Sequence, residues 1–338
     1  MKSLERIVAT VAFRATDRTP VIPQVFGHAA VLSGVPLEDY VCDGALLARC
    51  QLEALAHYRY DAVFALMDVN VEAEALGLRL NFAADRYPTV QAHALAAELL
   101  ATEPLRLPDP ESAGRMPELL RAAHLLREAL GDEVAVVGCV LGPMSLCAQL
   151  LGLEAALYLA IDEPEQFMQL LDFATEVLIR FGVAQINAGV HLPLVFDPAA
   201  SPEIIPVPFY REFLVPRLVR LFSALKAAGA RFNWLHTTGA IGAILPFYPL
   251  AGVELANLDY AVEPELAMQG LSWIAMNGNL KPLDFVYGAP DDIAKASARL
   301  LDLFAPRGGF ILSSGCEIPP EARPENIMAL VAAAMCES

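Results

Sequence analysis

Residues 134–138 read VAVVG, a run in which successive residues, rather than alternate ones, are apolar. Such a run is typical of a strand buried on both faces, as in a parallel sheet. Seven further runs of the same kind recur along the chain, separated by longer stretches with helical periodicity. They are residues 21–25 (VIPQV), 62–67 (AVFALM), 192–196 (LPLVF), 231–235 (RFNWL), 253–257 (VELAN), 273–277 (WIAMN) and 310–314 (FILSS).

Eight buried strands separated by helices predict an α/β fold, a (β/α)8 barrel of the TIM type. Barrels of this type hold about 200 to 400 residues in one unit, so residues 1–338 are expected to form a single domain. The segment 78–133 is long for one connection between strands and is expected to make an excursion over the barrel mouth, with a loop at 105–112. An open, doubly wound sheet is the alternative, although no G-x-G-x-x-G motif follows the early strands.

Helical periodicity is clear in three segments. Apolar residues three and four apart predict helix over 37–58. A helix over 164–188 is expected to end at Gly189, since glycine is common just past a helix C-terminus. In 208–230 the pattern contains Pro216, which predicts a kink because proline has no N–H to donate.

Composition excludes several classes of protein. Hydrophobic residues make up 56% of the chain and charged residues 19%, so a large core is expected rather than disorder. The net charge of −17 argues against a nucleic-acid partner, because phosphate would be repelled. Mean hydropathy is +0.44, but no stretch reaches the ~18–20 apolar residues that a membrane span requires. The first residues predict an amphipathic helix rather than a signal peptide, and a cytoplasmic location is expected.

Polar or metal-binding residues follow nearly every apolar run. In barrels the chemistry gathers at the carboxyl ends of the strands. Each residue taken singly is most simply explained as the start of a polar loop, but the set is rich in Asp, His and Cys. The residues are Gln24, His28, Asp68, Cys139, Asp197, His236, Asp259, Asn279 and Cys316.

His236 and Cys316 are the most suggestive pair. Imidazole nitrogen and thiolate sulfur are preferred ligands of Zn²⁺, and a zinc with an open position can hold a substrate thiol as thiolate. The two residues are distant in sequence, so only the barrel would bring them together. A hydrogen-bonded histidine and a buried cysteine are the alternative.

Several segments together resemble the uroporphyrinogen decarboxylase superfamily. The resemblance covers nearly the whole chain and implies a distorted (β/α)8 barrel. The segments are RTPVIPQV (18–25), YDAVFALMDVNVEAEALG (60–77), GPMSLCAQLLG (142–152), FDPAAS (196–201), FNWLHTTG (232–239), NGNLKP (277–282) and SSGCEIPPEARPENI (313–327).

Two branches of that superfamily compete. The decarboxylases carry an arginine-rich stretch after RTPV for the substrate's carboxylates, and residues 21–34 contain no arginine. Asp68, however, occupies the place of their essential aspartate. The methylcobalamin:coenzyme M methyltransferases carry His-x-Cys-Gly and a later Gly-Cys, whose histidine and cysteines bind zinc. This chain keeps His236 and Cys316 but has Thr238 where the first cysteine is expected.

The resemblance favours a methyltransferase that moves a methyl group from a methylcobamide, carried on a separate corrinoid protein, to a small thiol or related acceptor. Zinc would be held by His236 and Cys316, with Cys139, Asp68 or Glu74 completing the site. Asp68 and Asp197 are expected to line the mouth as catalytic groups. Contacts to the cobalamin are expected from Gln24, His28 and Asn279. The alternatives are a decarboxylase that uses Asp68, or a tetrapyrrole- or corrinoid-binding protein without activity.

Overall fold

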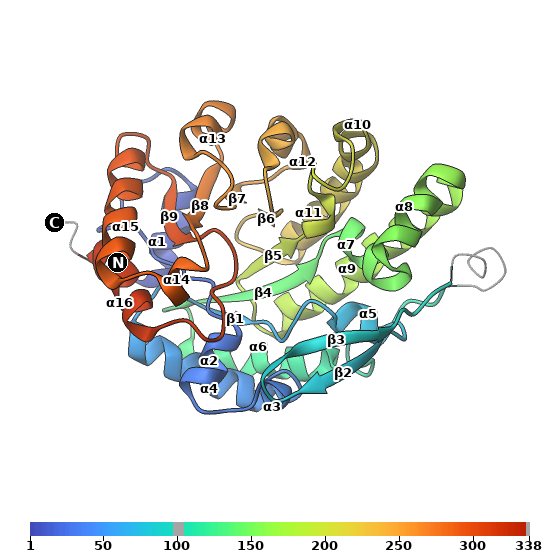
Figure 1. Ribbon diagram of the computed structural model, residues 1–338, viewed down its shortest axis with the longest axis horizontal. Coiled ribbons are helices and arrows are strands. Elements are labelled where there is room, and N and C mark those ends of the chain that lie inside the picture. The colour runs from blue at the N-terminus through green and yellow to red at the C-terminus, as the bar shows by residue number, and fades with distance from the viewer. Residues whose placement is uncertain (97–104, 336–338) are drawn as a thin grey trace.

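The computed structural model describes residues 1–96 and 105–335 (Figure 1). Seven parallel strands form one curled sheet in the order β1-β4-β5-β6-β7-β8-β9. This order follows the chain without reversal, as in a TIM-type barrel, whereas a doubly wound sheet reverses at a switch point. The strands are β1 (Ala62–Ala65), β4 (Ala135–Leu141), β5 (Leu192–Phe196), β6 (Trp234–His236), β7 (Leu255–Asn257), β8 (Ala275–Leu280) and β9 (Phe310–Ser314).

The predicted count of eight strands is wrong, because residues 21–25 do not become a strand. A single parallel bridge joins Val21 to Leu312 of β9, and the Val21 carbonyl accepts a hydrogen bond of 2.9 Å from the amide just before β1. Pro20 and Pro23 flank this bridge and have no N–H with which to continue a ladder. This extended segment therefore links the two edge strands of the curled sheet.

Helices cover the outside of the sheet (Figure 1). Within the described residues no single helix is long and apolar enough to cross a membrane; α7 and α8 together reach that length but meet at a bend of 107°. The helices are α1 (Ser3–Val11), α2 (Gly27–Leu32), α3 (Leu37–Tyr40), α4 (Gly44–Tyr58), α5 (Val71–Ala75), α6 (Met116–Leu130), α7 (Pro143–Leu151), α8 (Leu153–Asp162), α9 (Pro164–Ala188), α10 (Val207–Phe209), α11 (Val215–Ala228), α12 (Tyr248–Ala251), α13 (Pro264–Gly270), α14 (Asp284–Tyr287), α15 (Pro290–Phe304) and α16 (Pro324–Met335).

The helix predictions hold with local corrections. Helix α9 ends at Gly189, whose φ is 122°, as predicted. The segment 37–58 splits into α3 and α4, because the Asp43 carboxylate caps the start of α4 by accepting from two backbone N–H groups. Just before Pro216 the chain forms a π-helix over Tyr210–Leu214. This wider turn accommodates a proline, whose nitrogen carries no hydrogen to donate.

The predicted excursion begins with an antiparallel hairpin, β2 (Arg79–Ala83) and β3 (Arg86–Ala92). Residues 105–112 have no helix or strand, which confirms the predicted loop. Residues 97–104 of the excursion lie outside the described part of the chain.

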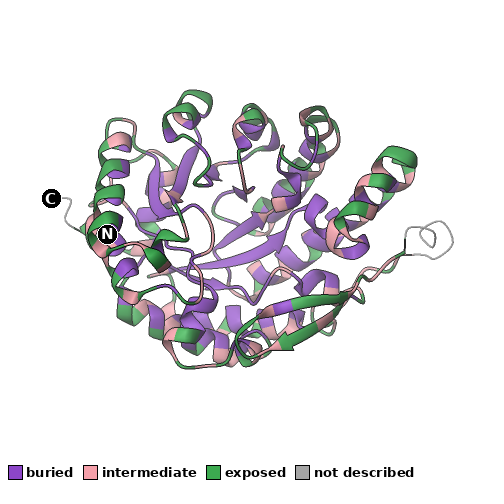
Figure 2. Ribbon diagram, in the orientation of Figure 1, coloured by how far each residue is buried: buried purple, intermediate pink, exposed green. Residues whose placement is uncertain are grey.

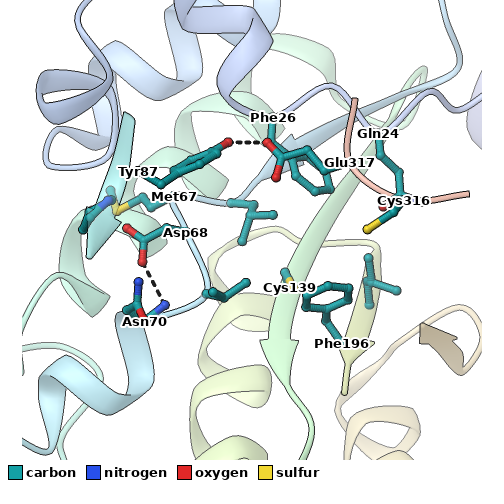
Figure 3. A pocket seen from close by; sticks show the side chains of 14 residues that line it. Gln24, Phe26, Met67, Asp68, Asn70, Tyr87, Cys139, Phe196, Cys316 and Glu317 are labelled. Carbon is teal, nitrogen blue, oxygen red and sulfur yellow. Dashed lines mark hydrogen bonds between the residues drawn. The ribbon is translucent and has the colours of Figure 1, made fainter. Parts of the chain in front are cut away.

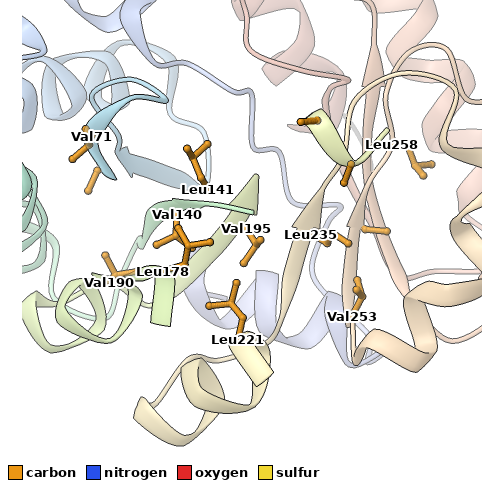
Figure 4. Close-up of a cluster of buried hydrophobic side chains, with 14 of the residues drawn as sticks. Val71, Val140, Leu141, Leu178, Val190, Val195, Leu221, Leu235, Val253 and Leu258 are labelled. Carbon is orange, nitrogen blue, oxygen red and sulfur yellow. The ribbon is translucent and has the colours of Figure 1, made fainter. Parts of the chain in front are cut away.

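Burial is nearly complete in the sheet (Figure 2). All of β4 is buried, and from Ala135 to Val140 its side chains alternate between two clusters. Val140 packs outward towards the helices with Leu178 and Leu221 (Figure 4), while Val137 faces the barrel interior. Helix α1 contributes Leu4 to the interior cluster. The interior of the barrel is therefore filled with side chains. The end that stays open is the one at which the strands terminate.

Candidate functional site

A cavity of about 150 Å³ lies at the carboxyl ends of the strands (Figure 3). Its walls come from the residues after β1, from β4 and β5, from the β3 hairpin strand, from the segment before α2 and from the residues after β9. Apolar side chains such as Phe26, Leu66 and Phe196 make up most of the surface. No lysine, arginine or histidine is among its fourteen lining residues.

Asp68 lines this cavity and is fixed by Arg115. Its carboxylate accepts hydrogen bonds from the guanidinium at 2.5 and 3.3 Å and from the backbone N–H of Asn70 at 2.8 Å. The Asp68 side chain is only 2% exposed. Arg115 also donates to Glu74 at 2.5 Å. One guanidinium therefore serves two carboxylates, and Glu74 points its oxygen at Arg115.

A second carboxyl group, that of Glu317, was missed by the sequence analysis. The Tyr87 hydroxyl donates a short hydrogen bond to Glu317, and the Gly27 amide donates to that hydroxyl at 2.7 Å. Burial raises the pKa of Glu317 to about 7, although the Tyr87 hydrogen bond acts in the opposite direction. The pair ties the hairpin to the residues after β9. Only the position of Glu317 beside Cys316 could have drawn attention to it.

Cys316 and Cys139 both line the cavity, as a shared site requires. Burial raises the pKa of the Cys316 thiol to about 12, and it raises that of Cys139 well above its ordinary value. Both side chains are therefore neutral thiols near pH 7.

His236 ends β6 and is fully buried. Neither ring nitrogen has a hydrogen-bond partner among the described residues, and burial lowers the pKa of the imidazole to about 3, so the ring is neutral. The ring packs edge-on against Phe196 with 4.6 Å between ring centroids. Phe196 lines the cavity and His236 does not.

Asp197 does not line the cavity either. Its Oδ1 accepts from the Ser145 amide at 2.8 Å and from the Ser145 hydroxyl at 2.7 Å, while Oδ2 has no partner. A Cβ at Gly142 would lie 2.1 Å from the Asp197 side chain, so only glycine permits this approach. Burial raises the pKa of Asp197 to about 6.

Of the three residues expected to contact a cofactor, only Gln24 lines the cavity. The His28 ring is hydrogen-bonded on both nitrogens, to the Tyr58 hydroxyl at 2.7 Å and to the Pro320 carbonyl at 3.0 Å. The Asn279 amide donates to two backbone carbonyls. Both side chains are thus engaged in holding the structure.

The fit to zinc is poor. Within residues 1–96 and 105–335, no three His, Cys, Asp or Glu side chains are gathered closely enough to hold a metal ion. Zinc sites in proteins use at least three such ligands. Cys316 lies at the cavity, His236 is packed behind Phe196, and Glu74 is paired with Arg115. In this arrangement the expected ligands do not fit a zinc site.

The sequence pattern of the uroporphyrinogen decarboxylase (URO-D) family matches residues 2–335. The chain belongs to this family. It is similar to the methylcobamide:CoM methyltransferase MtaA of Methanosarcina barkeri, with 29% identity over 290 residues, 83% of this chain and 82% of the relative. A uroporphyrinogen decarboxylase of Syntrophotalea carbinolica is 31% identical over 295 residues, 85% of this chain and 82% of the relative.

A solved structure gives the same result for the fold. A methyltransferase from Methanosarcina mazei superposes with a TM-score of 0.90 and 26% identity, over 99% of this chain and 98% of that one. This likeness confirms the predicted resemblance and a TIM-type fold. Methyltransferases and decarboxylases both occur among the relatives, so the chain is a member of an enzyme family.

Proposed function

We propose that this protein transfers a methyl group from a methylcobamide, carried by a separate corrinoid protein, to a small acceptor bound in the cavity. The observation that carries the proposal is that, among the described residues, no lysine, arginine or histidine lines the cavity. Uroporphyrinogen is rich in carboxylates, and each carboxylate buried without a cation is costly. The lining therefore favours methyl transfer over decarboxylation.

The size of the cavity assigns the two substrates to different places. A space of about 150 Å³ has room for a small acceptor such as a thiol. A corrin ring is much larger, so in this proposal it stays on its own protein and meets the mouth from outside. In this proposal the chain acts as a single domain and meets the corrinoid protein in the cytoplasm.

The chain's own residues bind and orient the acceptor. The Asp68 carboxylate is held in one position by Arg115 and Asn70, and Gln24 and Cys316 face the same space. The neighbouring apolar side chains exclude water from the bound acceptor, which strengthens its polar contacts. Zinc, which the resemblance implies for thiol activation, is not part of the proposed reaction.

Decarboxylation is the second candidate, and Asp68 is the observation that favours it. A carboxylate fixed at the cavity is suited to binding pyrrole N–H groups or to stabilising a cation. In that case the substrate's own carboxylates would have to lie outside the cavity lining described above.

Both candidates are tested on one preparation. Under anaerobic conditions, methylcobalamin is mixed with the protein and a series of small thiols. The loss of methylcobalamin absorbance and the formation of S-methyl product are then measured. Uroporphyrinogen is offered in parallel, and carbon dioxide is measured. We expect S-methyl product and no carbon dioxide. Carbon dioxide without S-methyl product would replace the proposal by the second candidate.

A further inference from the structure

Three of the residues that line the cavity, Gln24, Asp68 and Glu317, have side-chain oxygens that can accept hydrogen bonds. The Gln24 amide nitrogen donates to Asn257 Oδ1 at 2.8 Å and to the Ser314 carbonyl at 3.4 Å. Both partners are acceptors, because the Asn257 amide nitrogen itself donates to the Gly315 carbonyl at 2.8 Å. This network fixes which end of Gln24 is oxygen. Its Oε1 is left buried without a partner in a side chain that is 1% exposed.

Two carboxyl groups stand at the same cavity. Figure 3 shows Asp68 and Glu317 on different walls of it. Arg115 compensates Asp68 from behind but is shared with Glu74. Glu317 receives its side-chain hydrogen bond from a neutral phenol, that of Tyr87. The described lining thus carries acidic groups and no basic one, so its potential favours a positive charge.

Aromatic rings complete this environment. Phe26, Tyr87 and Phe196 all line the cavity. An organic cation within about 6 Å of an aromatic face is attracted by the ring quadrupole, more strongly when water is excluded. The negative face of such a ring does not attract a sulfonate or carboxylate.

We propose that the acceptor which enters this cavity carries a protonated amine, so that the site takes a small aminothiol rather than an anionic thiol. A primary ammonium has three N–H donors and no acceptor. The carboxyls of Asp68 and Glu317 are the acceptors that line its space, and the unpartnered oxygen belongs to Gln24, a third lining residue. The role as methyl acceptor rests on the proposed function, whereas the preference for a cation rests only on the cavity.

The test compares three thiols that differ at one end: cysteamine, 2-mercaptoethanol and 2-mercaptoethanesulfonate. Their binding to the full chain is measured by isothermal titration calorimetry at neutral pH with a non-thiol reductant. Charge-assisted hydrogen bonds are worth ~1.5–3 kcal/mol, so cysteamine is expected to bind on the order of tenfold or more tightly than 2-mercaptoethanol. The sulfonate is expected to bind most weakly.

Glu317→Gln keeps the shape of the side chain and removes the charge that Glu317 carries when deprotonated, and it is expected to weaken cysteamine binding about tenfold while leaving 2-mercaptoethanol unaffected. Glu165→Gln, an exposed residue of α9 outside the cavity lining, is the matched control and is expected to change neither. If Glu317→Gln does not fold, the wild-type series decides alone.

Equal binding of the three thiols, tighter binding of the sulfonate, or no binding of any thiol would overturn the inference. These outcomes are separable from failure of the proposed function. Preferential binding of cysteamine without methyl transfer would remove the methyltransferase and leave the cation site. Methyl transfer to the sulfonate thiol without any preference for cysteamine would leave the methyltransferase and remove the cation site.

Discussion

Asp68 and Asp197 each follow a strand of the same sheet, and both are almost completely buried. Asp68 lines the cavity and is paired with a guanidinium, whereas Asp197 faces packed side chains, receives only neutral donors and leaves Oδ2 without a partner. The first is paired with Arg115 beside a space that a ligand can enter. The second is a carboxyl group whose burial disfavours its charge.

The difference teaches that position at a strand end does not make a residue part of the site. His236 illustrates the same point, because it ends β6 and is nevertheless enclosed without a partner for either ring nitrogen. What distinguishes Asp68 is that it lines a cavity and is also paired with Arg115.

Among the variants that test this comparison, Arg115→Met is expected to lose the most stability. The variant leaves the buried carboxylate of Asp68 without its cation, and losing one partner of a buried ion pair costs about 3–5 kcal/mol. Urea unfolding followed by circular dichroism measures this loss. Arg121→Met removes an exposed arginine of α6 and is the control, expected to change stability by at most about 1 kcal/mol. Similar losses in the two variants would mean that Asp68 does not depend on its cation.

Asp197→Asn tests the other side of the comparison. Burial raises the pKa of Asp197 from 3.8 to about 6, so the folded state binds this proton more tightly than the unfolded state. Its contribution to stability is fully present below pH 3.8 and is lost as the pH rises through about 6. The wild type should therefore lose about 3 kcal/mol relative to Asp197→Asn between about pH 4 and pH 7. A difference between the two proteins that does not vary with pH would show that Asp197 is not perturbed.

A smaller effect is expected from His236→Leu. Two buried nitrogens without hydrogen bonds cost free energy, and an apolar side chain of similar size avoids that cost. We expect thermal unfolding to show unchanged stability or a gain of about 1 kcal/mol. His57→Leu, at an exposed position of α4, controls for the loss of a histidine. A large loss in His236→Leu alone would reveal a partner for the imidazole.

No effect at all is expected from removing metal ions. Because three ligands are not gathered in the described residues, dialysis against a strong zinc chelator should leave methyl transfer unchanged. Metal content before and after dialysis is measured by mass spectrometry. Stoichiometric zinc whose removal abolishes methyl transfer would contradict the arrangement described for His236 and Cys316.

The sequence was sufficient for most of the fold, because buried strands leave a local signal. Seven of the eight apolar runs became strands of the sheet, and the end of α9 at Gly189 was predictable from one residue. The prediction of a strand at 21–25 was wrong because it rested on the apolar residues and gave too little weight to Pro20 and Pro23. Proline removes the hydrogen-bond donor whatever the hydropathy of its neighbours.

The candidate site was less predictable, because its contacts join distant segments. Asp68, Gln24, Cys139 and Cys316, all named from the sequence, line one cavity, but their roles there stay predictions. The Tyr87–Glu317 hydrogen bond spans 230 residues of sequence, and Arg115 follows a loop with no pattern that points to Asp68. No periodicity encodes such pairs.

The central claim, that the cavity beside Asp68 is the reaction site, is tested most directly by methyl transfer in two matched variants. Asp68→Asn and Asp197→Asn each replace one buried carboxyl group by an amide of the same shape, and circular dichroism establishes that both are folded. Initial rates of methylcobalamin demethylation are then compared with the wild type. The account predicts a loss on the order of a hundredfold in Asp68→Asn, as for a group that contacts the reacting molecule, and a rate close to wild type in Asp197→Asn. A folded Asp197→Asn protein that loses activity while Asp68→Asn keeps it would contradict the account.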